Sequence, residues 1–121
     1  MMPVPLQTSV AAVAGTFAAF AVFLSVTAHI AARNVLGDVP VRRAVGVGPL
    51  PAGVAFVFTA LSWPSALAVV VAVALDAAAI KLLYKRDAKL TAYITLIHAV
   101  VSVILGVIIF GVWALALSAP A

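Results

Sequence analysis

The sequence of 121 residues has no glutamate and no cysteine, and charged residues make up only 8% of it. A water-soluble domain carries roughly 25% charged residues, so this composition excludes an ordinary soluble fold. The absence of cysteine excludes disulfides, thiol catalysis and cysteine-ligated zinc or iron–sulfur clusters. Negative charge is confined to Asp38, Asp76 and Asp87, which leaves no paired-carboxylate site for acid–base catalysis.

The positive charges lie in two short clusters, and long apolar stretches fill the rest of the chain. The clusters are Arg33, Arg42 and Arg43, and then Lys81, Lys85, Arg86 and Lys89. These residues flank apolar spans and have no interleaved aromatic residues, so we expect no nucleic-acid partner. The pattern predicts an all-α integral membrane four-helix bundle with two basic cytoplasmic loops and with the N- and C-termini outside.

The four predicted spans have the length that a lipid bilayer requires. We expect one transmembrane domain over residues 1–121, with antiparallel up-down-up-down spans at about 8–33, 41–62, 64–84 and 89–117. Trp63 and Tyr84 are 21 residues apart, and Tyr93 and Trp113 are 20 apart. Each separation corresponds to a helix of about 30 Å, the thickness of the hydrocarbon core. The aromatic residues therefore indicate the same two interfaces as the charges.

The connection between the first two spans carries helix-end signals. Gly37 is a residue at which the first helix can stop. Asp38 and Pro40 predict an N-cap and a first-turn proline for the helix that follows.

The second span contains several helix-breaking residues, namely Gly46, Gly48, Pro49 and Pro51. Each internal proline removes a backbone donor and pushes against the preceding turn. We therefore expect a kink or a short unwound segment between Val45 and Gly53. The segment is either a flexible turn near the lipid head groups or a functional hinge.

The first span carries a stripe of small residues with alternating spacings of four and three: Ala14, Ala18, Ala21, Ser25, Ala28 and Ala32. Such residues allow the close backbone approach on which helix association in lipid depends. The stripe therefore predicts a helix-packing face. Phe17, Phe20 and Leu24 lie on a different face, which we assign to lipid or to a partner.

The third and fourth spans each direct polar residues to one face. The fourth span has Thr91, Thr95, His98, Ser102 and Gly106 on one stripe, and unpaired polar groups in hydrocarbon are costly. Asp76 lies on the small-residue face of the third span, and an intramembrane carboxylate is a functional-site hypothesis by default. The short connection between these spans brings both stripes to similar depth. We therefore predict an Asp76–His98 pair, with Thr91, Thr95 and Ser102 as the neighbouring polar stripe.

Several roles for these polar residues remain open. The Asp76–His98 pair either fixes helix register or responds to protons, and Asp76 can alternatively reach solvent or Lys81. His29 fits a polar position near the head groups. Haem ligation by His29 and His98, or a metal held by both with Asp76, lacks any further sequence cue. A Ser102–His98–Asp76 triad would need an oxyanion hole and water. We therefore predict no cofactor, no metal site and no enzymatic activity.

Two families share general features with this chain. Its size and span count are similar to those of small multidrug resistance transporters, but their essential glutamate in the first span has no counterpart here. The Val- and Ala-rich spans and the basic loop Val39-Pro-Val-Arg-Arg43 resemble small uncharacterised four-span membrane proteins of haloarchaea and other GC-rich prokaryotes. That second resemblance covers the whole chain and implies no activity.

The combined pattern predicts a prokaryotic multi-pass protein of the plasma membrane that lies in the lipid bilayer. We expect a structural or interaction subunit that forms a homo-oligomer or joins a larger membrane-protein complex. The alternative is a small proton- or cation-responsive transporter or channel that uses the Asp76–His98 pair.

Overall fold

A computed structural model describes residues 9–120, and the regular elements within that range are all helices. They are α1 (Val10–Leu36), α2 (Val41–Val47), α3 (Pro49–Ala60), α4 (Ser65–Tyr84) and α5 (Ala88–Ser118). With Val41–Ala60 counted as one, four helices are long and apolar enough to cross a membrane. The all-α prediction is therefore confirmed for these residues. Thr8, the predicted start of the first span, lies outside them.

Local signals explain where the long helices begin and end. The Ser9 side chain accepts from the Ala12 N–H at 3.0 Å, and the Asp87 side chain accepts from the Leu90 N–H at 2.9 Å. Both are N-caps that satisfy a free donor of the first turn. Gly37 ends α1 with a φ of 84°, a backbone region that glycine adopts without steric cost.

The second membrane-length helix is interrupted at Gly48, within the segment where a kink is expected. Pro49 and Pro51 have no N–H to donate to the carbonyls of Val45 and Val47, four residues earlier. Gly48 nevertheless keeps helical dihedral angles, with φ −57° and ψ −41°. The chain therefore passes from α2 to α3 through a bend, without an unwound segment.

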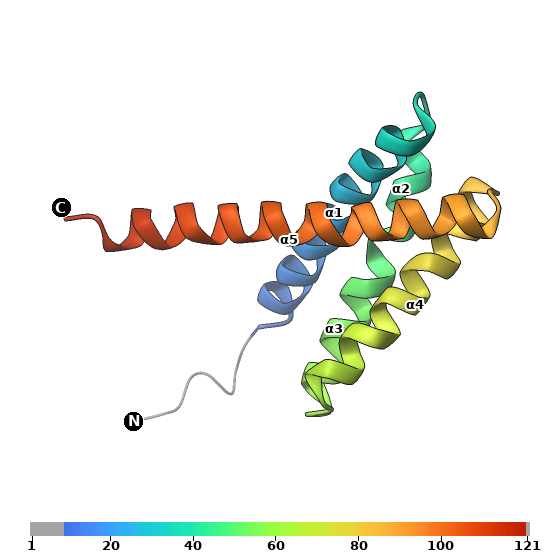
Figure 1. Cartoon of the computed structure of the whole chain (residues 1–121). Coiled ribbons are helices and arrows are strands. Elements are labelled where there is room, and N and C mark those ends of the chain that lie inside the picture. Colours follow the sequence, from blue (N-terminus) through green and yellow to red (C-terminus); the bar gives the residue numbers. More distant parts are fainter. Residues whose placement is uncertain (1–8, 121) are drawn as a thin grey trace.

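Helix α5 crosses the other helices obliquely (Figure 1). Its buried residues are Thr91, Ile94, Thr95 and His98, all of which lie in its first half. From there the helix leaves the bundle, and its second half projects away from the remaining elements (Figure 1). The chain thus forms a helix bundle that is closely packed around one part of α5 only.

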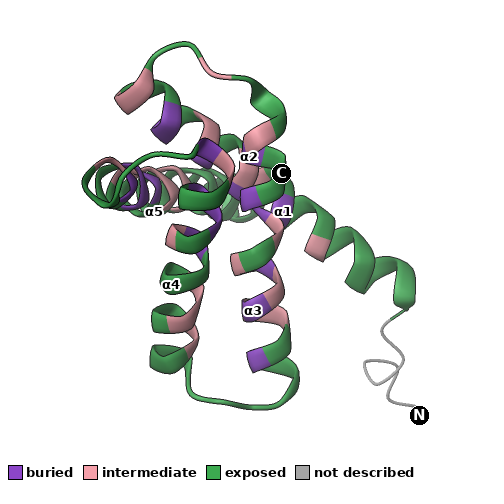
Figure 2. Ribbon diagram, turned by 90° about the vertical axis from the view of Figure 1, so that its right-hand side faces the viewer, coloured by how far each residue is buried: buried purple, intermediate pink, exposed green. Residues whose placement is uncertain are grey.

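The main buried cluster lies between the ends of α1 and α4, the short helix α2 and the start of α5, and Figure 2 shows the buried positions of the chain in purple. Small side chains such as Ala28 and Ala32 line it on α1, and Ile80 and Tyr84 fill it from α4. Tyr84 is only 1% exposed. Its assignment as an interfacial anchor was therefore wrong, because its ring packs inside the protein.

Candidate functional site

Asp76 on α4 and His98 on α5 are in contact inside the bundle. Nδ1 of His98 lies 2.6 Å from Oδ2 of Asp76, and His98 and Asp76 are 3% and 6% exposed. Only residues 85–87 connect α4 to α5, so the two helices form a hairpin that brings these positions together. The two ionisable residues that the sequence pattern pairs are thus hydrogen-bond partners in the structure.

The second ring nitrogen of His98 joins this pair to α1. Nε2 lies 2.9 Å from the backbone carbonyl oxygen of Leu24. A carbonyl oxygen only accepts hydrogen bonds, so Nε2 carries a hydrogen and donates it. Both nitrogens of the imidazole are therefore engaged, and His98 links three helices.

This contact fixes the number of protons that the pair holds. With Nε2 protonated, one further proton lies between Nδ1 and Oδ2. Either the carboxylic acid of Asp76 donates to a neutral imidazole, or the imidazolium of His98 donates to a carboxylate. Both arrangements contain the same protons and have no net charge. A hydrogen-bonded pair without net charge is far less costly to bury than an isolated carboxylate.

Two hydroxyl groups extend the network from the Leu24 carbonyl. Oγ1 of Thr27 donates to that carbonyl at 3.1 Å, as threonine commonly does within a helix. Because its own hydrogen is used, Oγ1 accepts the hydrogen of Ser102, whose Oγ lies 2.7 Å away. We call the Leu24 carbonyl together with Thr27, Asp76, His98 and Ser102 the polar node.

The other two members of the predicted polar stripe lie nearer the start of α5 and stay outside the node. Thr91 and Thr95 are both buried. Oγ1 of Thr95 donates to the Thr91 carbonyl at 2.8 Å, whereas the Thr91 hydroxyl has no partner among the described residues. The stripe therefore faces inward as a whole, but it does not act as one network.

A cavity of about 180 Å³ borders the polar node. Asp76, His98 and Ser102 contribute its polar wall, and Pro51 reaches it from α3. The second carboxyl oxygen of Asp76, Oδ1, is buried and has no hydrogen-bond partner among residues 9–120. The node thus contains one unused acceptor that is enclosed by protein, and the neighbouring space is lined mainly by apolar groups.

The small-residue stripe of α1 divides into two parts. Ala21, Ala28 and Ala32 are buried and Ser25 is half-buried, whereas the outer positions Ala14 and Ala18 are exposed. A side chain at Gly48 would overlap Oγ of Ser25 and the carbonyl of Ala21. The inner part of the stripe is therefore where the α2–α3 bend packs against α1.

The candidate hinge residues lie in different environments. Gly48 is buried in that helix contact, and a side chain at Gly46 would meet only the end of Leu83, at 2.8 Å. Pro51 is half-buried beside the cavity, and Pro49 is half-buried at the bend. The close contact at Gly48 indicates a packed joint between helices.

The two basic clusters lie at the same end of the bundle, where α1 turns into α2 and α4 turns into α5 (Figure 1). The guanidinium carbon of Arg43 lies 5.9 Å from the ring centroid of Tyr84, a cation–π contact that links the two clusters. Arg33 and Asp38 form an exposed ion pair of 3.9 Å. The structure thus places the charges together at one end.

The residues available for a metal or haem are few. Among residues 9–120, no three side chains of histidine, cysteine or acid type are grouped so that they could hold a metal ion. His98 would have to give up a hydrogen bond to become a ligand. His29 lies on α1 beside a separate groove lined by α1 and α2 residues, and its Nδ1 has no partner in the described part of the chain.

Two members of the polar node were missed in the sequence. Thr27 lies in an apolar span, and polar groups in such spans turn inward, so a usable signal was present. The Leu24 carbonyl carries no such signal, because every residue has a carbonyl. The Leu24 side chain was assigned to lipid or a partner, yet it is only 8% exposed and packs with Ala21 and Ala52.

Comparison with known proteins gives a family but no activity. No curated protein matches the sequence, and no solved structure matches it. One family model matches residues 7–120, nearly the whole chain. The chain belongs to a family of unknown function, DUF7473.

Proposed function

We propose that this protein is a multi-pass membrane protein of the plasma membrane that acts as a non-enzymatic interaction subunit, through contacts with itself or with a larger membrane complex. Four helices long and apolar enough to span a membrane support the membrane location. The exposed outer part of α5 and the polar node each support a role as an interaction subunit.

The outer part of α5 is the observation that carries the proposal. Every residue from 107 to 118 is exposed, and Phe110 and Leu115 are 76% and 73% exposed. None of these residues is buried, although Ile109 and Phe110 border a groove that they share with Phe20 of α1. In a bilayer this length of helix is covered by lipid or by another helix. A side chain added at Gly111, within this part, would meet nothing within 4 Å, so a second backbone can approach closely there.

The polar node supports a structural use of the intramembrane histidine. A general base needs a ring nitrogen without a hydrogen that can reach a substrate, whereas Nε2 of His98 donates to a backbone carbonyl and Nδ1 is paired with Asp76. The node instead ties α1, α4 and α5 together at one level. The node therefore fixes the position at which α5 crosses α1.

Mass measurement of the detergent-solubilised protein, together with cross-linking in native membranes, tests the proposal. We expect a discrete assembly that Gly111→Ile weakens by about 5-fold to 150-fold, because overpacking a close contact costs about 1–3 kcal/mol. Gly53→Ile is the matched control on α3, where the added side chain also meets nothing within 4 Å. A wild-type protein that is monomeric in both settings and purifies without a partner would refute the proposal.

A second candidate, a proton- or cation-responsive transporter, is favoured by the unpaired Oδ1 of Asp76 beside its cavity. A carboxyl oxygen there can receive a proton or contact a small cation. In reconstituted vesicles, this function predicts pH-driven flux that Asp76→Asn abolishes while the assembly stays unchanged. Wild-type vesicles without any flux would remove this candidate.

A further inference from the structure

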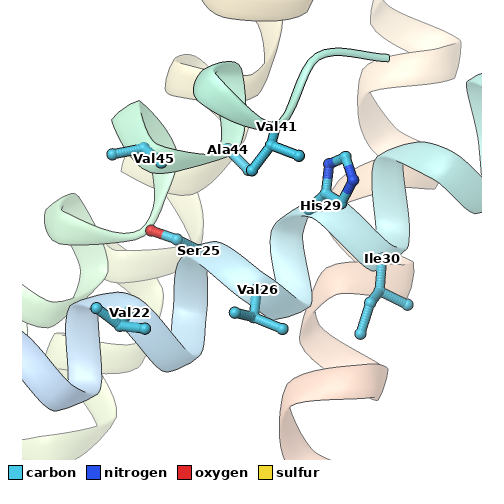
Figure 3. Close-up of a pocket in the computed structure, with 8 residues that line it drawn as sticks. All are labelled: Val22, Ser25, Val26, His29, Ile30, Val41, Ala44 and Val45. Carbon is cyan, nitrogen blue, oxygen red and sulfur yellow. The ribbon is translucent and has the colours of Figure 1, made fainter. Parts of the chain in front are cut away.

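An apolar groove of about 240 Å³ runs between α1 and α2 near the basic end of the bundle (Figure 3). Val22, Val26 and Ile30 line it along α1, and Val41 and Val45 line it on α2. Each of these five side chains is exposed, so the groove opens outward. In a membrane-embedded protein, an outward-facing apolar groove meets lipid chains directly.

A positive charge lies just beyond the groove, on the same face of α1. Arg33 follows Ile30 by three residues and Val26 by seven, which places it on the helix face that lines the groove. It lies 11 residues beyond Val22, a rise of about 16 Å along the helix. The Arg33 side chain is 58% exposed. Its pairing with Asp38 is long, at 3.9 Å, and the Asp38 side chain is fully exposed. Such a pair holds the guanidinium weakly.

His29 and Ile30 are neighbours on α1, and both lie between Val26 and Arg33. His29 precedes Arg33 by four residues, about one helical turn. Its ring stands between α1 and Val41 of α2 (Figure 3). The buried Nδ1 has no hydrogen-bond partner among the described residues. The groove is therefore apolar at Val22 and Val26, carries one polar side chain beside Ile30 in the next turn, and is followed by Arg33. A phospholipid has its charge at one end of its apolar chains in the same way.

We propose that this groove binds one anionic phospholipid, with an acyl chain along Val22, Val26 and Ile30 and the phosphate at Arg33. A guanidinium group binds phosphate through two parallel hydrogen bonds, and the net charge of +4 attracts anionic head groups. The site rests on the membrane location in the proposed function. It does not require self-association, because the outer part of α5 is remote from α2 in the fold (Figure 1).

Native mass spectrometry of the full chain in detergent micelles tests the site, with phosphatidylglycerol and phosphatidylcholine of identical chains as probes. We expect the wild type to bind one phosphatidylglycerol about tenfold more tightly than phosphatidylcholine. Arg33→Gln should bring that preference within about twofold. Arg86→Gln, which removes a charge from the other basic cluster, should leave the preference intact and serves as the matched control.

Two further measurements separate the groove from the charge. Val26→Phe fills the groove, so it should weaken binding of both lipids alike while Arg33 stays in place. Glycerol phosphate, which carries the anionic group without chains, should not compete. Equal binding of both lipids by the wild type, an unchanged preference in Arg33→Gln, or full competition by glycerol phosphate would overturn the proposal. Gly111→Ile should leave lipid binding unchanged, so a failure here is distinct from a failure of the proposed assembly.

Discussion

Substitution of Asp76 by asparagine and by alanine gives a direct test of the hydrogen bonding in the polar node. Two arrangements are compatible with the geometry, and separated charges are the costlier of the two in hydrocarbon. We therefore expect the carboxylic acid to donate to neutral His98. The amide N–H of asparagine can donate to Nδ1 in the same way, and Nε2 can still donate to the Leu24 carbonyl. Asp76→Asn should then change the unfolding free energy by less than about 0.5 kcal/mol.

Alanine at position 76 removes the donor and leaves a space beside the existing cavity. Hydrogen bonds between membrane helices contribute about 0.6 kcal/mol on average and up to about 1.7 kcal/mol. An unsatisfied buried polar atom adds about 1–3 kcal/mol. Because the contact measures 2.6 Å and both residues are buried, we place Asp76→Ala at a loss of about 2 kcal/mol.

The assay is reversible unfolding of the detergent-solubilised protein by sodium dodecyl sulfate, followed by circular dichroism. A double-mutant cycle of Asp76→Ala with His98→Ala should give a coupling energy of about 1–2 kcal/mol. A coupling near zero would refute the hydrogen bond itself. A loss in Asp76→Asn as large as that in Asp76→Ala would refute the uncharged arrangement and favour imidazolium with carboxylate.

Three further substitutions test the packing of the bundle. Gly48→Ala should destabilise the protein by about 1–3 kcal/mol in the same unfolding assay, because its new methyl group meets α1 backbone. Gly46→Ala should cost less than about 1 kcal/mol, because its methyl group meets only the movable side chain of Leu83. Equal costs at the two glycines would argue against the close contact at Gly48. Tyr84→Phe should leave stability unchanged or raise it by about 1 kcal/mol, because the buried hydroxyl of Tyr84 has no partner among residues 9–120. A loss above about 1 kcal/mol would mean that the hydroxyl is satisfied in the folded protein.

The Asp76–His98 contact could be predicted because polar side chains in an apolar span avoid lipid and face the other helices. Asp76 and His98 each lie on the small or polar face of their helix, and only residues 85–87 connect the two helices. Helix period and connection length then fix their relative depth. Gly37 as the end of α1 is another prediction that is confirmed, because the backbone there has positive φ.

The predicted start of the second span at residue 41 is confirmed, but the predicted roles of Asp38 and Pro40 at that start were wrong. Pro40 occupies the N-cap position, where no side chain bonds to the first turn, and α2 begins at Val41. The Asp38 side chain lies two residues further back and pairs with Arg33. Spacing within a short loop therefore located the helix start to within a residue, but it did not identify the partner of Asp38.

The remaining parts of the site depend on how whole helices cross, which residue spacing along one chain does not determine. Ridges and grooves on two surfaces set a crossing angle, so the oblique path of α5 follows from many side chains at once. That path brings His98 to the Leu24 carbonyl and places Ile94 against the cluster that buries Tyr84.

The same crossing connects the polar node to the proposed association. The node holds α5 from His98 to Ser102, and the main buried cluster holds it at Ile94. Beyond Ser102, a side chain added at Gly106 would meet only the Phe23 ring, at 3.9 Å. A helix fixed over half its length presents its other half in a defined direction. If α5 associates through residues 107–118 as proposed, weakening the node should disturb assembly, even though none of its members lies in that surface.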